Sequence, residues 1–222
     1  MKLKVIALSL FASLCVLTSS GQEVSKDIEK VKSLYEEGKY LRVEFKCYNL
    51  STDDRVRREP LLYLYWSMSN YQISMMEDQV EDYPTAYKDA VKQAVKFMKK
   101  DKTKTFWSQG EDHIILLRGE VLAKANDLLA QEEYRKAKTE YKTLTKLSPA
   151  DQHPWFMKSL CELELKMLSD ARVSFEKAMG MEGSLERFAE LSADQQQQLR
   201  SNFESWFEAN STDTDDDGKS RP

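Results

Sequence analysis

The chain has 222 residues, with 33 lysines and arginines against 37 aspartates and glutamates, so its formal net charge is −4 at pH 7. A mildly acidic chain lacks the basic face that nucleic-acid binding requires, so we expect no nucleic-acid partner. Only seven glycines occur, and no Val/Ile/Thr-rich alternation of the kind that indicates strands is present in the sequence. These features predict an all-α protein.

Residues 1–21 read as a signal peptide. Lys2 and Lys4 precede an apolar run at 5–16 that is too short to span a bilayer as a mature helix. Small residues then stand at the two positions that signal peptidase requires, the second of them Gly21. We therefore expect cleavage near Gly21 and a periplasmic or secreted protein.

Two other readings of the N-terminal segment remain open. One is an uncleaved membrane anchor, and the other is a lipoprotein attached through Cys15. The second is disfavoured because Leu14 stands where a bacterial lipobox has a small residue. No later run approaches 18 apolar residues, so we expect no integral membrane segment after cleavage.

The remaining chain is expected to be helical throughout, as four helix pairs followed by a short and a longer helix. The expected pairs are 24–37 with 39–51, 59–78 with 84–100, 109–131 with 133–147, and 152–166 with 169–181, and the last two helices are near 184–190 and at 193–208. Pro60 and Pro84 suit the first turn of a helix, where the missing N–H has no partner in any case.

One pattern of aromatic and small residues recurs in the second helix of each pair. Its members in the third pair are Tyr134, Ala137, Tyr141 and Leu144, followed by Pro149. The pattern starts at Tyr40, Tyr87, Tyr134 and Leu168, so its steps are 47, 47 and 34 residues. We expect the thirteen extra residues of the longer steps to lengthen both helices of a pair, by about six or seven each. A long loop between ordinary helices is the alternative.

This spacing resembles the tetratricopeptide repeat, a helix-turn-helix unit of 34 residues. The resemblance covers 118–181 best, 24–51 moderately and 59–100 weakly. It implies a right-handed solenoid of about four antiparallel helix pairs with elongated middle repeats and a C-terminal capping helix. The concave side of such a solenoid binds a protein or peptide. Lys158 and Glu162 depart from the family pattern, which usually has large apolar residues there.

Some members of this family hold a peptide carboxylate in a basic clamp on the inner helices. Asn126 falls where one clamp asparagine would lie. The basic positions of the clamp are occupied by Leu122, His153 and Met157, so that specificity does not transfer to this chain.

The expected domains are the signal peptide at 1–21, the helical repeat domain at 22–209 and a disordered acidic tail at 210–222. The 193–208 helix has one apolar side and is expected to cap the array, with docking on a partner or membrane as the alternative. The tail resembles the opening of a calcium loop, but the closing glutamate is missing, so we expect no metal.

Residues that commonly carry chemistry are few. The two histidines are His113 and His153, and neither belongs to a recognisable catalytic motif. We therefore expect no catalytic residues, no cofactor and no enzyme activity. Cys47 and Cys161 are expected to be free buried thiols, although an oxidising compartment would permit a disulfide.

The segment 61–76 concentrates tyrosines, one tryptophan and methionines on a single expected helix. One face of that helix must enter the core, and the other is expected to present amphipathic anchors to a peptide. The candidate partner-binding residues are Tyr63, Trp66, Asn70 and Asn126. A purely structural role in the core is the alternative for the aromatic residues.

The expected function is that of a non-catalytic scaffold or adaptor of the bacterial cell envelope, which holds a protein or peptide partner in its concave groove. Two alternatives stay open. The chain can be a helical ligand-binding protein or enzyme with a pocket among the long middle helices. It can also be a structural subunit that associates with itself through 193–208.

Overall fold

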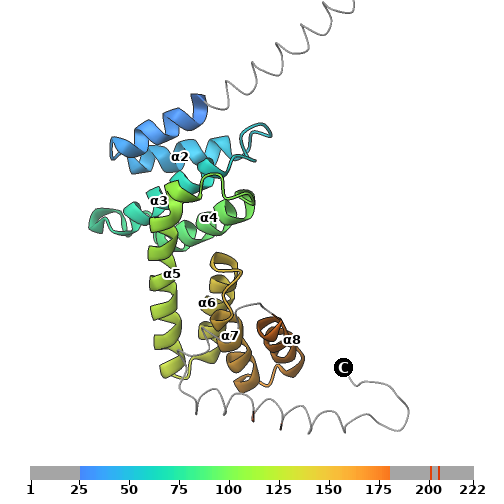
Figure 1. Cartoon of the computed structure of the whole chain (residues 1–222). Coiled ribbons are helices and arrows are strands. Elements are labelled where there is room, and N and C mark those ends of the chain that lie inside the picture. The colour runs from blue at the N-terminus through green and yellow to red at the C-terminus, as the bar shows by residue number, and fades with distance from the viewer. Residues whose placement is uncertain (1–25, 181–200, 202–204, 206–222) are drawn as a thin grey trace, which may run out of the picture. The chain divides into compact units, whose positions relative to one another are not determined.

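A computed structural model describes residues 26–180, together with residues 201 and 205 (Figure 1). The predictions for 1–21, 184–190, 193–208 and 210–222 fall wholly or almost wholly outside these residues. Between 26 and 180 all regular structure is helical and no residue lies in a strand, which confirms the all-α class for this part of the chain. None of the described helices is long and apolar enough to cross a membrane.

The described part opens with a helix at 26–36, and the remaining elements follow in chain order. These elements are α2 (Tyr40–Leu50), α3 (Pro60–Ser74), the short 3-10 helix η1 (Glu77–Gln79), α4 (Ala86–Lys100), α5 (Trp107–Ala130), α6 (Tyr134–Leu147), α7 (His153–Glu164) and α8 (Leu168–Met179). Pro60 is the first residue of α3, as expected from its missing N–H.

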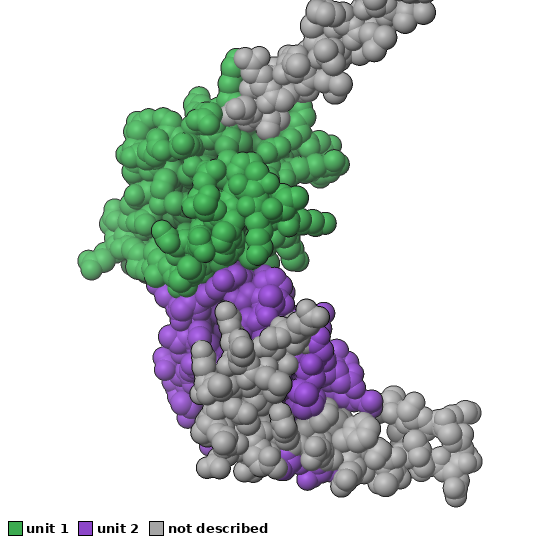
Figure 2. Space-filling view, viewed as in Figure 1, with its two compact units in different colours: residues 1–117 green, residues 118–222 purple. Residues whose placement is uncertain are grey.

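The chain divides into two compact units, Met1–Leu117 and Arg118–Pro222, called unit 1 and unit 2 below (Figure 2). Helix α5 begins in unit 1 and ends in unit 2. Within unit 1, α3 packs against both α2 and α4. Within unit 2, α7 packs against both α6 and α8.

Three of the turns that join the two helices of a pair have the same backbone geometry. Gly38, Glu132 and Lys166 have positive φ angles of 71°, 57° and 57°, and each stands two residues before the next helix. At the first turn the N–H of Gly38 donates to the Tyr35 carbonyl, and the next N–H donates to the Leu34 carbonyl. The other two turns repeat both hydrogen bonds at the same offsets, which is the Schellman arrangement that ends a helix.

The buried positions of the second helices follow the recurring pattern. The residue three positions after the first residue of the pattern is fully buried in all four helices. These residues are Val43, Ala90, Ala137 and Ala171. Three of these four residues are alanine, and a small side chain lets the neighbouring helix approach closely. The four second helices therefore present equivalent core positions in equivalent places.

The extra residues of the longer steps do not lie where the sequence predicted. In the second step they lengthen one helix only, because α5 has 24 residues and its counterpart α7 has 12. In the first step they lie mostly between helices, since α3 ends at Ser74 and the link to α4 contains η1. The expected helix 59–78 is therefore too long at its end.

The composition of that link explains why α3 stops. Glu77 and Glu81, like Asp78 and Asp82, would lie one helical turn apart and repel each other in a continued helix. Pro84 lies before α4, not in its first turn as the sequence predicted, and it disfavours helical geometry at the residue before it.

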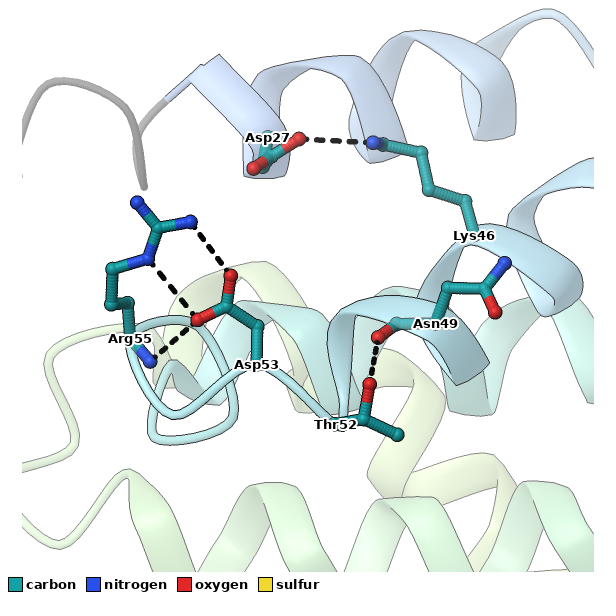
Figure 3. A network of polar contacts seen from close by, with 6 residues as sticks. All are labelled: Asp27, Lys46, Asn49, Thr52, Asp53 and Arg55. Atoms are coloured by element: carbon teal, nitrogen blue, oxygen red, sulfur yellow. Dashed lines mark hydrogen bonds and ion pairs between the residues drawn. The ribbon is translucent and has the colours of Figure 1, made fainter.

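A small polar network ties the first elements together (Figure 3). Lys46 on α2 forms an ion pair with Asp27 on the 26–36 helix, with 2.9 Å between Nζ and Oδ1. After α2, the Asp53 carboxylate accepts hydrogen bonds from both the backbone and the side chain of Arg55. These bonds hold the pKa of Asp53 at about 2 and fix the start of the turn that leads to α3.

Candidate partner-binding surfaces

Helix α3 is buried on nearly every side because it lies against both α2 and α4. Its partly exposed residues include Leu61, Met68 and Gln72, which recur at seven and four residues and so lie along one side of the helix. We call these three residues the α3 strip. At 100° per residue, Met68 is about 200° from Trp66, so the α3 strip and Trp66 are on opposite sides.

Three of the four sequence-predicted binding residues lie in the core of unit 1. Tyr63, Trp66 and Asn70 are exposed by only 5%, 7% and 3%. The Tyr63 and Trp66 rings stack with 6.3 Å between their centroids, and the Tyr63 hydroxyl donates a hydrogen bond of 2.9 Å to the Arg57 carbonyl. Their geometry is that of packed core side chains with little free surface for a partner.

The fourth predicted residue, Asn126, is exposed on the part of α5 that belongs to unit 2. Its Oδ1 accepts a 2.7 Å hydrogen bond from the hydroxyl of Tyr141 on α6. Tyr141 is fully buried, and burial raises the pKa of its hydroxyl. Asn126 thus satisfies a core tyrosine and does not belong to the same unit as the other three residues.

Aromatic residues flank the α3 strip on the side of the first helix. The ring of Tyr35, on the 26–36 helix, lies 5.8 Å from the ring of Tyr65 and 5.4 Å from that of Tyr40, centroid to centroid. Tyr35 is partly exposed, and burial raises the pKa of its hydroxyl, as does the neighbouring Tyr40. Together with the α3 strip, this tyrosine gives one side of unit 1 an amphipathic surface.

A lysine row on α4 covers the aromatic pair on the other side of α3. Lys96 Nζ lies 5.3 Å from the Tyr63 ring centroid and 5.6 Å from the Trp66 centroid, and Lys100 Nζ lies 4.9 Å from the Tyr63 centroid. These distances are those of cation–π interactions. The pKa of Lys96 is lowered by burial and by the charges of Lys92 and Lys100, while Asp89 opposes the shift.

The sequence contains a signal for this lysine row, although the predicted binding residues do not include it. Lysines recur every four residues at 88, 92, 96 and 100, the spacing that aligns side chains along one side of a helix. The net charge of the whole chain is negative and does not reveal such a local positive surface.

Helix α2 carries an exposed apolar stripe. Leu41, Phe45 and Tyr48 are exposed by 36%, 66% and 59%, and their spacing of four and three residues places them along one side of the helix. Glu44 lies beside this stripe. Its pKa is raised by burial and by the nearby Asp89 of α4, and lowered by the Trp66 indole.

His113 forms a structural contact with the hydroxyl of Ser67. Ser67 Oγ on α3 lies 2.8 Å from His113 Nε2 on α5 and donates a 2.7 Å hydrogen bond to the Ala90 carbonyl on α4. Because a hydroxyl has a single proton, which goes to Ala90, His113 Nε2–H is the donor to Ser67. Burial lowers the pKa of His113 to about 4, so the ring is neutral at pH 7. This chain of bonds does not activate Ser67 as a nucleophile.

Cys47 and Cys161 are free and buried, as the sequence predicted. The Cys47 thiol points to the Leu62 carbonyl at 3.7 Å, and burial raises the pKa of Cys161 to about 12, so neither thiol is reactive at neutral pH. Within the described part of the chain, no group of three or more His, Cys, Asp or Glu side chains is placed to hold a metal ion.

No protein-family model matches this chain, and neither do any curated proteins or solved structures. The function therefore has to be inferred from the chain's own residues and their geometry.

Proposed function

We propose that this protein is a non-catalytic scaffold of the tetratricopeptide type, which binds a protein or peptide partner in the bacterial cell envelope. In this proposal the chain forms a right-handed solenoid of about four antiparallel helix pairs. The first helix of each pair contributes to the inner wall, which holds the partner.

The observation that carries the proposal is the recurrence of one helix junction. In two of the three recurring turns the positive-φ residue, Glu132 or Lys166, is not glycine, and such residues rarely adopt this geometry without a structural requirement. They are 34 residues apart, the length of the repeat. A fully buried residue recurs three positions after each start of the pattern, and the last two, Ala137 and Ala171, are also 34 residues apart.

The binding face that fits this proposal is made of other residues than those the sequence predicted. In unit 1 the first helices of the pairs are 26–36 and α3, and their accessible side carries the α3 strip and Tyr35. Tyrosine and methionine give large contact areas, and methionine adapts to different partners. We therefore assign partner contact to the α3 strip in place of Tyr63, Trp66 and Asn70.

The location in the envelope rests on the expected signal peptide. A periplasmic or secreted scaffold needs neither a cofactor nor a membrane-spanning helix of its own. The neutral His113, whose Nε2 is bonded to Ser67, and the buried thiols favour a binding role over a reaction at these groups.

Site-specific photo-crosslinking in the source organism tests the proposal. A photoreactive phenylalanine analogue would replace Met68 or Gln72 in one set of cells, and exposed Lys142 of α6 in a control set. We expect one defined protein to be captured from positions 68 and 72 and not from 142, as identified by mass spectrometry.

Three other results would count against the scaffold. Capture of only the same chain from positions 68 and 72 would favour a self-associating subunit. A small molecule that raises the melting temperature and protects these positions from crosslinking would favour a ligand-binding protein. Equal capture from all three positions would indicate no specific face.

A further inference from the structure

We propose that unit 1 has a second interaction surface, which binds an acidic amphipathic segment of a partner protein. This surface is defined by Leu41, Phe45 and Tyr48 of α2 and by Lys92, Lys96 and Lys100 of α4, and we call it the α2–α4 face. It lies on the Trp66 side of α3, opposite the α3 strip, and so it goes beyond the proposed function.

The lysines give the α2–α4 face its positive charge. Lys92, Lys96 and Lys100 recur every four residues, and like charges at this spacing repel each other on a helix. Among the described residues, the salt bridge of this row joins Lys92 to Asp89, with 3.7 Å between Nζ and Oδ1. Three lysines beside this one aspartate leave an excess of positive charge, which attracts an anionic partner.

The spacing of the row fits carboxylates on a polypeptide. Four residues of an α-helix rise about 6 Å, so the three lysines lie along one line at about that interval. Glutamates one turn apart on a partner helix repeat at the same interval. A partner segment with such glutamates can therefore pair with several lysines at once.

The exposed stripe of α2 gives the α2–α4 face its apolar half. Phe45 is exposed by 66% and Tyr48 by 59%, and Leu41 lies one turn before Phe45 on the same side. Single exposed apolar residues are common, but three in line on one helix form a continuous patch of the kind that marks an interaction site. An acidic segment with one apolar side would cover this stripe.

Electrostatic contacts connect the stripe with the lysines. Glu44 lies along α2 between Leu41 and Tyr48, and it interacts with Asp89 of α4. Asp89 in turn interacts with Lys96. Helices α2 and α4 both pack against α3, and Lys96 lies over the Trp66 ring of α3, so the stripe and the row belong to the two helices that flank α3.

Phosphate-rich partners fit this surface less well. Glu44 and Asp89 are carboxylates within the same face and would repel phosphates. The Tyr63 and Trp66 rings are buried and already covered by lysines, so they offer no free ring face on which bases could stack. An acidic protein segment with one apolar side fits better, because its carboxylates can face the lysine row while its apolar side covers the stripe beside Glu44.

The test uses the full chain and a fluorescent probe peptide of about 18 residues, which is helical and has glutamates one turn apart on one side and leucines on the other. Binding is followed by fluorescence anisotropy. The control probe has lysine in place of each glutamate. We expect the acidic probe to bind, the basic probe not to bind, and the affinity to fall several-fold between about 50 and 300 mM NaCl, because surface charge pairs are screened by salt.

Matched variants locate the binding surface. Lys96→Gln with Lys100→Gln should weaken binding about five- to tenfold, since two surface charge pairs with the probe are lost. Lys142→Gln with Lys146→Gln removes two exposed lysines at the same spacing on α6 and should change binding less than about twofold. For the apolar half, Phe45→Ser should weaken binding, whereas Val173→Ser, at a residue of similar exposure (63%), should not.

Circular dichroism and the melting temperature establish that each variant is folded. If loss of the lysine–aromatic contacts unfolds the lysine variant, Phe45→Ser and the salt titration still decide the question. Equal weakening by the control variants would overturn the proposal. Tighter, lysine-dependent binding to vesicles of phosphatidylglycerol and phosphatidylcholine, or to a single-stranded oligonucleotide, would overturn it as well. None of these results depends on capture from positions 68 and 72, so this inference and the proposed function can fail separately.

Discussion

His113 donates a hydrogen bond to Ser67 across 2.8 Å, and Ser67 donates in turn to the Ala90 carbonyl, so one short chain of bonds joins α5, α3 and α4. Ser67 is completely buried and His113 is partly buried. A buried hydroxyl and imidazole in a helical core are stable only when both are paired. The contact therefore specifies how three helices of unit 1 meet.

This contact predicts a loss of stability at mildly acidic pH. The pKa of His113 is about 4 in the folded chain, against 6.5 for an ordinary histidine, so the unfolded state binds the proton more tightly. The stabilising contribution is complete above pH 6.5 and is lost as the pH falls towards 4, by at most about 3 kcal/mol. Urea unfolding of unit 1 between pH 7.5 and 4.5 measures this loss.

Two histidine variants isolate the effect. His113→Gln removes the titrating group, and the decline in unfolding free energy between pH 6.5 and 4.5 should become shallower. His153→Gln changes the other histidine, in unit 2, and should leave the decline unchanged. An identical decline in wild type and His113→Gln would show that other groups cause it.

The recurring positive-φ turns predict opposite effects for substitutions at equivalent positions. No atom lies within 4 Å of a Cβ added at Gly38, so Gly38→Ala is opposed only by the backbone conformation and should cost about 1 kcal/mol. Glu132→Gly and Lys166→Gly relieve the same strain at exposed sites and should stabilise by up to about 1 kcal/mol. Chemical denaturation of each variant provides the comparison, and stabilisation by Gly38→Ala would contradict the assignment of these turns.

Substitution of alanine for two glycines of α5 should change stability in opposite directions, because only one of them is closely packed. A Cβ at Gly110 would meet Leu64 Cδ1 at 2.7 Å and Phe97 Cε1 at 3.1 Å, whereas one at Gly119 would meet nothing within 4 Å. Gly110→Ala should therefore destabilise, by about 1–3 kcal/mol, because Leu64 and Phe97 are fully buried and have to shift. Gly119→Ala should stabilise by about 1 kcal/mol through helix propensity alone. If thermal melts showed both variants to be stabilised, α3 and α4 would not approach α5 this closely.

For a buried ion pair in unit 2, removing one partner and replacing the whole polar group should change stability differently. Lys158 Nζ lies 2.7 Å from Glu162 Oε1, and both groups hydrogen-bond to the buried Ser174 hydroxyl at 2.6 Å. Glu162→Ala leaves a largely buried lysine charge without its carboxylate and should cost about 3–5 kcal/mol.

The matched variant replaces the whole polar group. Lys158→Met, Glu162→Leu and Ser174→Ala together should be close to neutral or stabilising, because no buried charge or hydroxyl is left behind. Urea midpoints of the two variants are compared directly. A triple variant as unstable as Glu162→Ala would mean that the polar group stabilises unit 2 by more than its desolvation penalty.

Lys158 and Glu162 also show what the sequence pattern could not reveal. Their i, i+4 spacing on α7 is enough to predict the ion pair between them, but the buried Ser174 hydroxyl that bonds to both comes from α8. The same holds for Trp66: its spacing placed it on α3, and only the packing of α2 and α4 against that helix decided that it is buried. Periodicity gives a residue's side of a helix, not the number of neighbours that cover it.

Local spacing was sufficient to predict the helical class and the positions of the second helices, because these follow from the 3.6-residue period and from capping. The placement of the extra residues, the pairing of His113 with Ser67, and the choice between Trp66 and the α3 strip as accessible surface were decided by tertiary structure. Each of these depends on contacts between segments distant in sequence, and burial in such contacts is a property of the assembled helices rather than of any one of them.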